Sequence, residues 1–563
     1  VAAAVQTAVL LAEHTAGGMA MATLVTMAAL TIGQGLVAVG RERSTGGLLI
    51  AIRRRTSQPA TIAVLACTAV GLTVRLITFR GIWLDEATSI RQARMHFAGM
   101  IGNLYQTDVH PPLYFALLWT TVRVFHSYSE FVLRVPSVVC GTAIIPVTYF
   151  AARDLFDRRT AIVATVLSVF APLMVWYSQE IRMYAQFMLL GLLAMWGQVM
   201  AYRTGRRPYW AVWAVSSGLL AWTEYFGLLQ VLSQQLMFLW VLWKDRWTDG
   251  FQRLMRKWLG WSLVMATIIL PVMPFAYHQF IVNQQAGKGF HLAPSQAGTA
   301  TLGIRNRYGV YALLANLIWA GWGYQPNATM TELGALWPLG MLMALLLLGR
   351  RPGRNVGLLA MGFAGPVLIL TGLAYFKHFL LDVRYVSGAV PLVVLAAARL
   401  ITATSRRMLP VAAVTTVVTA SLAVALVNEQ TNSSNPRHYA FHSALTRIVG
   451  AYRPGDVIAY APSDIGGVVR YYAPTEDVVQ VSRAAPPPMG HQHEVFVVLS
   501  RRLTSPAALS SFYKEQLPAI ERAGFVLEKF SVPNVKVWEV EVTRRMGPGN
   551  VPTPVPRRPA GVR

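Results

Sequence analysis

Two neighbouring carboxylates just beyond an apolar segment are the first residues whose chemistry suggests a function. Asp85 and Glu86 lie in the motif Trp83-Leu84-Asp85-Glu86-Ala87, a few residues after the apolar segment 59–79. A carboxylate that is partly buried at a membrane surface can take a proton from an incoming hydroxyl group. Acid pairs in loops are more often solvated and inert, so only the position beside an apolar segment favours catalysis by Asp85, with Glu86 beside it.

A histidine and an arginine follow in two further motifs. In Asp108-Val109-His110-Pro111-Pro112-Leu113, the diproline begins a helix and holds His110 near its start. A helix-start signal with a solvated histidine explains this motif equally well. In Leu133-Arg134-Val135-Pro136-Ser137, Arg134 lies at the end of an apolar segment. It either extends to lipid headgroups or turns inward to bind a lipid phosphate.

The remaining motifs mix aromatic rings with polar and charged groups. The motif Trp176-Tyr177-Ser178-Gln179-Glu180-Ile181-Arg182-Met183-Tyr184 connects two apolar segments. An aromatic belt at the membrane surface accounts for its rings but not for its polar side chains. We therefore take as candidate binding residues Tyr177, Gln179, Glu180, Arg182 and Tyr184. The motifs Lys377-His378 and Asp382-Val383-Arg384-Tyr385 add Lys377, Arg384 and Tyr385, and the weaker turn Glu224-Tyr225 adds Tyr225.

No cofactor is required by these motifs, although a divalent metal ion is an open alternative. Glu180, His110 and His378 carry suitable donor atoms, but no spacing among them demands a metal.

The composition places all of these motifs in a membrane protein. Of the 563 residues, 54% are hydrophobic and only 13% are charged, whereas soluble domains carry about 25% charged residues. Crossing a bilayer takes roughly 20 apolar residues. Segments near this length predict spans at 17–39, 59–79, 134–152, 160–177, 185–202, 208–223, 226–243, 258–277, 334–349, 355–375, 386–404 and 408–427. We thus predict an all-α bundle with about 11–13 spans.

The distribution of positive charge orients this bundle. The net charge of +25 would suggest nucleic acid in a soluble protein, but arginine and lysine gather in short loops between alternate spans, such as 153–159, 203–207 and 244–257. This positive-inside pattern assigns those loops to the cytoplasm. The candidate motifs then share the extracytoplasmic face of the plasma membrane. A span at 111–125 would invert every later loop, so this short apolar run is predicted to lie on the membrane surface.

A small second domain is predicted after the last span. Alternating apolar runs at 456–462, 494–500, 525–532 and 535–542 predict strands, and helical patterns lie near 437–452 and 504–523. We predict an extracytoplasmic α/β domain, with Pro533-Asn534 turning the last two strands into a hairpin. Its role in recognising an acceptor is a hypothesis. The expected domains are 1–56 with an extra span and a cytoplasmic loop, 57–427 as the catalytic bundle, 428–545 as the α/β domain and 546–563 as a disordered tail.

Carboxylates and several cations on one membrane face suit the displacement of an anionic lipid headgroup. Arginine offers paired donors to phosphate oxygens. A phosphodiester is a good leaving group, so one base suffices, whereas glycoside hydrolases need an acid and a base. The sequence contains no P-loop and no dinucleotide-binding glycine signature. This fits an extracytoplasmic site, where lipid-linked sugars rather than nucleotide sugars are the donors.

The motifs around Asp85, His110 and Arg134 resemble those of a known class of enzymes. Asp85-Glu86, then Asp108-Val109-His110-Pro111-Pro112-Leu113, then Arg134 with Pro136, are similar to the protein O-mannosyltransferases. The same order recurs in the wider GT-C class, including the lipid A aminoarabinose transferases and the actinobacterial arabinofuranosyltransferases. The segment 177–184 resembles bacterial members of the mannosyltransferase-like superfamily. The resemblance covers about residues 57–427 and is most specific in the first half.

The resemblance implies a role for several residues. Asp85 would be the catalytic base, Glu86 would assist acceptor or base positioning, and Arg134 would bind the donor phosphate. His110 agrees with the mannosyltransferases, whereas the aminoarabinose transferases have lysine before the diproline. Tyr114-Phe115 stands where mannosyltransferases carry glycine and lysine, which argues against a protein acceptor.

These observations predict an inverting glycosyltransferase that moves a sugar from a polyprenyl-phosphate donor to a hydroxyl of a glycan, lipid or protein acceptor. A transporter or lipid flippase is the main alternative, although transporters place charges near the bilayer midplane, whereas these charges lie at one end of the spans. A non-catalytic membrane scaffold is a third possibility. It leaves the gathering of Asp85, His110, Arg134 and Arg182 unexplained.

Overall fold

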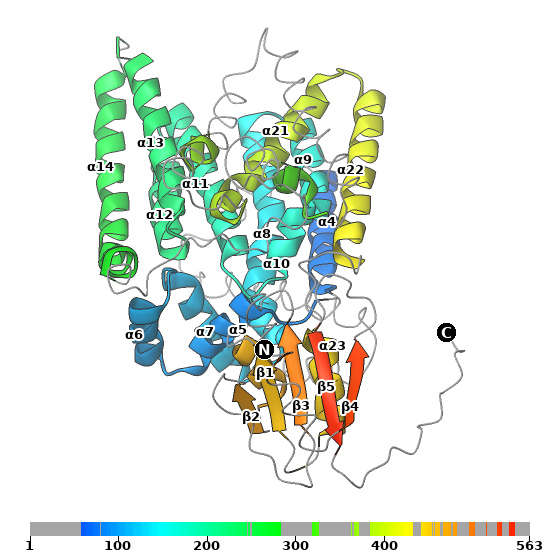
Figure 1. Cartoon of the computed structure of the whole chain (residues 1–563). Helices are drawn as coiled ribbons and strands as arrows, with labels where there is room; N and C mark the ends of the chain where they lie inside the picture. Colours follow the sequence, from blue (N-terminus) through cyan, green and yellow to red (C-terminus); the bar gives the residue numbers. More distant parts are fainter. Residues whose placement is uncertain are drawn as a thin grey trace. The chain divides into compact units, whose positions relative to one another are not determined.

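The described part of the chain divides into a helical unit and an α/β unit (Figure 1). The structure, a computed structural model, describes residues 58–282, 318–325, 365–370, 383–431, 441–480, 495–500, 526–531 and 540–546, with short gaps inside some of these ranges. The described residues within 1–79 and 89–432 form the helical unit, and those within 80–88 and 433–563 form the α/β unit.

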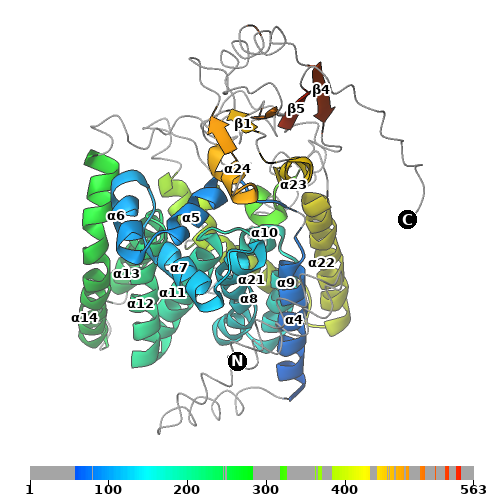
Figure 2. The same ribbon diagram turned by 90° about the horizontal axis from the view of Figure 1, so that it is seen from below.

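Long helices make up the helical unit. Its membrane-length and connecting helices are α4 (Gln58–Leu76), α6 (Phe97–Thr107), α7 (Leu113–Phe125), α8 (Glu130–Leu155), α9 (Arg158–Phe170), α10 (Pro172–Ser178), α11 (Tyr184–Thr204), α12 (Arg207–Thr223), α13 (Gly227–Lys244), α14 (Phe251–Ile269), η1 (Leu270–Val272), α15 (Met273–Tyr277), η2 (His278–Val282), η3 (Val383–Ala389), α21 (Val390–Ala403) and α22 (Met408–Thr431). Helix α5 (Leu84–Arg94) begins in the α/β unit and continues into the helical unit. Figures 1 and 2 both show α4, α8 and α9 side by side, and these three helices contact one another.

The prediction of a multi-span helical bundle is confirmed. Among the described residues, five helices are long and apolar enough to cross a membrane, or six if α9 and α10 form one bent span. The predicted spans 59–79, 208–223 and 226–243 are the helices α4, α12 and α13, of 19, 17 and 18 residues. Helix α7 has 13 residues and falls below spanning length, as predicted for 111–125. The predicted spans 17–39 and 334–349, and about two-thirds of 355–375, lie outside the described residues.

The predicted span 160–177 is broken in the structure. Helix α9 ends at Phe170, and α10 begins at Pro172 and bends away by 57°. Proline lacks the N–H that would continue the helical bonding, so the last carbonyls of α9 need other donors. The buried Arg75 of α4 supplies them, because its Nη2 donates to the carbonyl of Ser168 at 3.1 Å and its Nε donates to Ser178 Oγ at 3.2 Å. One side chain thus holds both sides of the break.

Helix α8 shows which end of the bundle carries the basic loops. Ser129 caps its first turn by accepting from Val132 N at 3.5 Å, and its 26 residues extend over about 39 Å. At its C-terminal end, Arg203 of α11 donates to the carbonyl of Asp154 at 2.7 Å. The loops 153–159 and 203–207 therefore meet at one end of the bundle.

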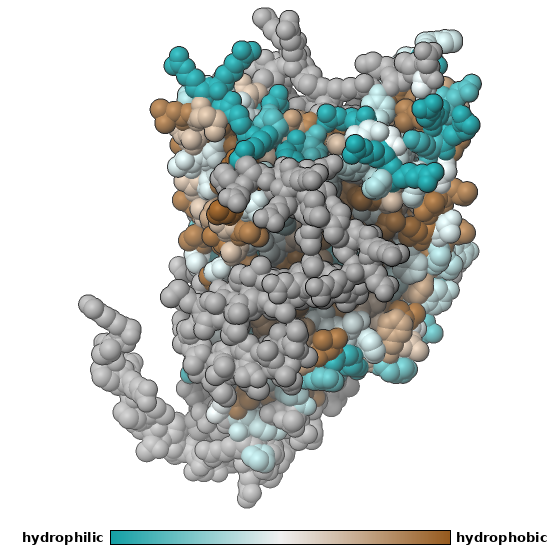
Figure 3. Space-filling model, turned by 180° about the vertical axis from the view of Figure 1, so that it is seen from behind, coloured by the Kyte–Doolittle hydropathy of each residue, from teal (hydrophilic) through white to brown (hydrophobic). Residues whose placement is uncertain are grey.

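The surface of the helical unit fits a lipid environment. Side chains such as Leu263 on α14 and Val417 on α22 are apolar and exposed, and only 11% and 22% of the apolar windows of these two helices are buried. Figure 3 shows hydrophilic residues gathered at one end, where Figure 1 shows α13 joining α14 and α21 joining α22, with hydrophobic residues below them. An apolar belt bounded by a polar end is the pattern expected where helices contact lipid.

The α/β unit contains a five-stranded mixed sheet. Its strands are β1 (Val457–Ala461), β2 (Asp477–Gln480), β3 (Val495–Ser500), β4 (Val526–Ser531) and β5 (Val540–Met546), in the order β2-β1-β3-β5-β4. Strand β1 is parallel to β2 and β3, and β5 is antiparallel to β3 and β4. Helices α23 (Phe441–Ala451) and α24 (Gly466–Tyr472) contact each other, and α24 contacts β1 and β2.

The predicted α/β architecture agrees with this sheet, with differences in detail. The two strands predicted as a hairpin are the antiparallel pair β4 and β5, and β5 begins at Val540 rather than at 535. The predicted turn at Pro533-Asn534 lies outside the described residues. The short elements β2 and α24 were not predicted, since four and seven residues are too few to show a clear period. The predicted helix 504–523 and the tail beyond 546 lie outside the described residues.

Candidate active site

The two carboxylates predicted from the sequence lie in the first turn of α5, where they do different things. Glu86 is buried, and its Oε2 accepts a hydrogen bond from Trp83 N at 3.1 Å. This is the bond that a carboxylate at the third helical position makes to the capping residue. Asp85 is partly exposed in the same turn. Glu86 thus fixes the helix start, and Asp85 is the carboxylate at this turn that stays accessible.

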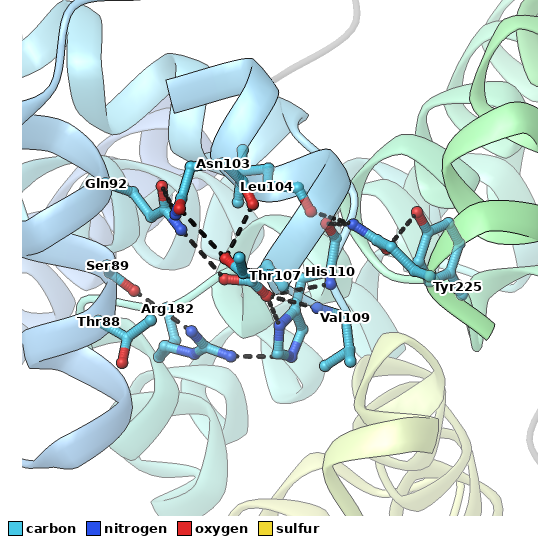
Figure 4. Close-up of polar contacts among 12 residues, drawn as sticks. Thr88, Ser89, Gln92, Asn103, Leu104, Thr107, Val109, His110, Arg182 and Tyr225 are labelled. Atoms are coloured by element: carbon cyan, nitrogen blue, oxygen red, sulfur yellow. Dashed lines mark hydrogen bonds and ion pairs between the residues drawn. The ribbon is translucent and has the colours of Figure 1, made fainter. Parts of the chain in front are cut away.

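His110 connects a buried carboxylate to a buried arginine (Figure 4). Its Nδ1 lies 2.7 Å from Asp108 Oδ1, and its Nε2 lies 2.9 Å from Arg182 Nη2. A guanidinium group can only donate, so Nε2 accepts and Nδ1 carries the proton donated to Asp108. The two bonds therefore select one neutral tautomer of the ring. We name Asp108, His110 and Arg182 the charged triad.

The acid of the charged triad is held as a carboxylate. Asp108 Oδ1 also accepts from Val109 N at 2.7 Å, and Oδ2 accepts from Gln92 Nε2 at 3.4 Å. Burial alone would raise the pKa of Asp108. The hydrogen bond from His110, the electrostatic contributions of His110 and Arg182, and the Val109 N–H outweigh burial and lower the pKa to about 2. Asp108 is thus a fixed anion at physiological pH.

Arg182 joins three segments of the helical unit. Its Nη1 donates to Ser89 Oγ on α5 at 3.3 Å, its Nη2 binds His110, and its own carbonyl accepts from Ser137 Oγ on α8 at 3.0 Å. The side chain is 2% exposed. A buried guanidinium held in this way is a preorganised cation with a defined direction, which is what recognition of a phosphate requires.

Arg134 lies against the same turn but is directed into the protein. Its Nε donates to the carbonyl of Gln179 at 2.9 Å, and its Nη1 pairs with Glu130 at 2.6 Å. Gln179 in turn donates to the carbonyl of Ile77 at 2.6 Å and accepts from Gln430 at 2.9 Å. Arg134 and Gln179 therefore brace the turn that carries Arg182. Phosphate binding by Arg134 stays a prediction.

The aromatic members of the 176–184 motif form a buried network. Trp176 Nε1 donates to Glu180 Oε1 at 2.7 Å, and the Tyr177 and Tyr324 hydroxyl oxygens lie 2.7 Å apart. The rings of Tyr177 and Tyr184 are 4.7 Å apart. All of residues 171–188 are buried. The segment read from the sequence as an external turn is thus covered by its neighbours, because α22 and the segment around Tyr324 lie against it.

A second buried carboxylate, Glu224, lies in the electrostatic range of the charged triad. It follows α12 and is 5% exposed. Burial raises its pKa, and the electrostatic contributions of His110, Arg182 and Arg384 oppose this rise only in part. Glu224 thus lies within electrostatic range of both Arg182 and Arg384.

The adjoining Tyr225 connects this neighbourhood to the end of α6. Its hydroxyl donates to Gln279 Oε1 at 2.8 Å, and Gln279 Nε2 donates to the carbonyl of Leu104 at 2.6 Å. Burial, reinforced by the charges of Glu224 and Asp108, raises the pKa of the Tyr225 hydroxyl. Tyr385 contacts the next residue along the turn, stacking on Phe226 at 4.2 Å. The weakest candidate from the sequence is therefore built into the site.

The sequence analysis missed several polar partners of the charged triad. Ser89 and Gln92 follow Asp85 at spacings of four and seven residues, which places all three on one face of α5. This polar stripe was a readable signal. Glu224 lies in the turn that was predicted as the weakest candidate, but only Tyr225 was taken from it. Gln279 had no signal in the sequence, because its contacts come from distant segments. Lys377 and His378 lie outside the described residues.

The described residues hold no group of three or more His, Cys, Asp and Glu side chains suited to a metal ion. Two of the candidate ligands are engaged otherwise: Glu180 accepts from Trp176, and both ring nitrogens of His110 have protein partners.

Comparisons with known proteins define the class. Residues 109–278 match the family of dolichyl-phosphate-mannose-protein mannosyltransferases. A comparison with curated proteins finds no match. The chain resembles the structure of ArnT from Cupriavidus metallidurans bound to undecaprenyl phosphate, with a TM-score of 0.54 and 14% identity, covering 87% of this chain and 98% of that one. It also resembles the oligosaccharyltransferase AglB from Archaeoglobus fulgidus, in complex with an inhibitory peptide and a dolichol-phosphate, with a TM-score of 0.51 and 13% identity, covering 88% of this chain and 75% of that one.

The fold and the matched segment point to one class, the multi-span membrane glycosyltransferases. The matched segment contains His110, Arg134, Arg182 and Glu224, and so most of the site described above. The match over residues 109–278 and the resemblance in fold support membership of the GT-C superfamily of these enzymes.

Proposed function

We propose that this enzyme transfers a sugar from a polyprenyl-phosphate donor to an acceptor hydroxyl with inversion at the anomeric carbon. The observation that carries the proposal is the buried, oriented Arg182, which lies at the end of α8 opposite the basic loops and shares the electrostatic environment of Glu224 with Arg384. Two cations at the membrane surface suit a lipid phosphate. The matched family, and the lipid phosphates bound by the two similar structures, support a donor of this kind.

In the proposed reaction, Asp85 is the general base. It takes the proton of the acceptor hydroxyl as the oxygen attacks the anomeric carbon. The bond between that carbon and the phosphate oxygen breaks, and the electron pair leaves with the polyprenyl phosphate. Arg182 and Arg384 stabilise the negative charge on the leaving phosphate. Asp85 precedes Ser89 by one helical turn, and Ser89 is bound by Arg182, which supports a joint role for these residues.

The charged triad gives the phosphate site its direction. Asp108 fixes the tautomer of His110. The guanidinium of Arg182 donates to His110 and to Ser89, so it cannot rotate without breaking both bonds. Asp108 also offsets part of the positive charge, which lets Arg182 remain buried before the donor arrives. We assign Arg134, Gln179 and Tyr177 to bracing of the turn that carries Arg182.

We further propose that the site faces the extracytoplasmic side. The turn 179–182 lies at the N-terminal end of α8, and the arginine-rich loops lie at its C-terminal end. The positive-inside rule assigns the latter to the cytoplasm. We keep the domain boundaries 57–427 and 428–545 and the extracytoplasmic side of the α/β domain as proposals from the sequence, because the last predicted span runs outward.

A transfer assay in proteoliposomes tests the proposed function. Short-chain polyprenyl-phosphate sugars are supplied with acceptors of several classes, and release of polyprenyl phosphate is measured together with the anomeric configuration of the product. We expect release that requires an acceptor and produces an inverted glycoside, lowered about 10²–10⁴-fold in Asp85→Asn. Normal transfer by Asp85→Asn would refute the assignment of the base. Transport of the lipid without glycoside formation would favour a flippase instead.

A further inference from the structure

The segment that carries Asp85 belongs to the α/β unit. Residues 80–88 group with residues 433–563 and not with the helices that precede and follow them in the chain. Nothing in the sequence indicates this association, because more than 340 residues separate the two parts. The start of α5 is therefore placed by a domain that follows the last span.

Three contacts make this association. Tyr472, the last residue of α24, accepts a hydrogen bond at its hydroxyl from Ile82 N at 2.9 Å. Gly81 lies so close to α23 that an added Cβ would come within 2.6 Å of His442 Cβ. An added Cβ on Gly467 of α24 would come within 3.3 Å of Ala87 Cβ. The contacts thus include residues on both sides of Asp85.

The hydrogen bond from Ile82 fixes the backbone immediately before the helix. Ile82 is 0% exposed, so its N–H has no access to water and Tyr472 satisfies it. The next N–H, that of Trp83, is bound by Glu86. Two consecutive amides are therefore anchored, one by the α/β unit and one within the helix. Asp85 follows in the first turn, and its position depends on both anchors.

We propose that Tyr472 is a positioning residue for Asp85, through which the α/β unit sets the geometry of the catalytic base. The effect of Tyr472 on catalysis rests on the proposed function, whereas its effect on the backbone of residues 80–88 does not. Tyr472 does not take part in the chemistry. It holds Ile82, and α23 and α24 supply the surface on which residues 81–87 lie.

Tyr472→Phe in the full-length protein removes the hydroxyl and keeps the ring. An intramolecular hydrogen bond is worth about 2- to 10-fold in an equilibrium, so we expect amide exchange in the peptide 80–88 to rise by about that factor. We expect kcat to fall by a similar factor with the donor KM unchanged, because the phosphate-binding arginines are untouched. Tyr471→Phe is the matched control, since its ring lies beside that of Tyr472 at 4.9 Å. It should change neither quantity.

A second test enlarges Gly81 and then removes the side chain of His442, which lies against it. Gly81→Ala should lower kcat at least as much as Tyr472→Phe, because its Cβ would collide with that of His442. His442→Gly removes the colliding atom, so the double variant Gly81→Ala/His442→Gly should recover most of the lost rate.

The outcomes separate this inference from the proposed function. If amide exchange at 80–88 is unchanged in Tyr472→Phe, the positioning role is refuted whatever the enzyme does. If exchange rises but kcat stays normal while Asp85→Asn is inactive, the contact is structural and the inference also fails. If Asp85→Asn is fully active, the proposed base is wrong, and the exchange result still reports on the contact.

Discussion

Replacing Arg182 tests whether the site needs a guanidinium group or only a positive charge. Arg182 binds Ser89 Oγ at 3.3 Å and His110 Nε2 at 2.9 Å through different nitrogens. The single ammonium of lysine cannot reproduce this fork. In Arg182→Lys the charge stays but its direction is lost, whereas in Arg182→Met both are lost.

The expected loss of kcat/KM follows from the hydrogen bonds that Arg182 would make to the donor phosphate. Hydrogen bonds to charged groups contribute about 1.5–3 kcal/mol each, and about 1.4 kcal/mol corresponds to a tenfold change. Loss of one bond to the donor phosphate should therefore lower kcat/KM for the donor by about 10- to 150-fold in Arg182→Met. Arg182→Lys should recover part of this loss. The acceptor KM should change little, because the arginine is assigned to the phosphate.

Steady-state transfer kinetics with varied donor and acceptor measure both variants, and Arg123→Lys is the matched control. Arg123 on α7 also uses two nitrogens, donating to Tyr128 at 2.6 Å and to the carbonyl of Met95 at 3.2 Å, but it is not part of the charged triad. It should leave the donor kinetics unchanged. A donor kcat/KM in Arg182→Met equal to that of the unaltered enzyme would refute the phosphate-binding role.

Three further substitutions give distinct outcomes. Arg75→Met leaves the carbonyl of Ser168 without its donor and should destabilise the folded protein by about 1–3 kcal/mol. We expect a lower thermal midpoint in detergent, which Arg75→Lys partly restores. An unchanged midpoint would show that other contacts hold the break between α9 and α10. Asp108→Asn should lower the free energy of unfolding by about 2 kcal/mol at neutral pH, because the Asp108 pKa of about 2 lies below its usual 3.8. This stabilisation is complete above pH 3.8 and is lost as the pH falls toward 2. A difference in thermal midpoint between the variant and the unaltered protein that is equal at low and neutral pH would contradict this prediction. Glu224→Gln should stabilise the protein increasingly as the pH rises above 4.5, because the raised pKa of Glu224 makes its ionisation unfavourable in the folded state. The thermal midpoints of the variant and of the unaltered protein, measured against pH, check this prediction. A difference between the two midpoints that stays constant with pH would exclude this cause.

The helices of this protein could be predicted more fully than their breaks and contacts. Long apolar segments predicted α8, α11, α21 and α22 because burial in lipid imposes a minimum length on any helix that crosses. The bend at Pro172 was not predicted, although proline was visible there, because a proline kink and a straight span have the same average hydropathy. The donor to the carbonyls at the break is Arg75, which is nearly 100 residues away in the sequence.

Within the site, the motifs were recognisable but their roles were not. The charged and polar residues Asp85, His110 and Arg182 attracted attention because such groups are costly near lipid. That Glu86 caps α5 and Arg134 braces a turn follows from which backbone groups lie near them, and this depends on tertiary packing. The same limit applies to residues 80–88, whose association with α23 and α24 has no local signal in the sequence.

A density map of the enzyme with a polyprenyl-phosphate sugar analogue bound tests the central claim most directly. We predict the phosphate within hydrogen-bond distance of Arg182 and Arg384, at the end of α8 that carries Arg134, with the anomeric carbon turned toward Asp85. A phosphate bound instead among the arginines of the loops 153–159 and 203–207, at the opposite end of α8, would contradict the proposed site and its extracytoplasmic orientation.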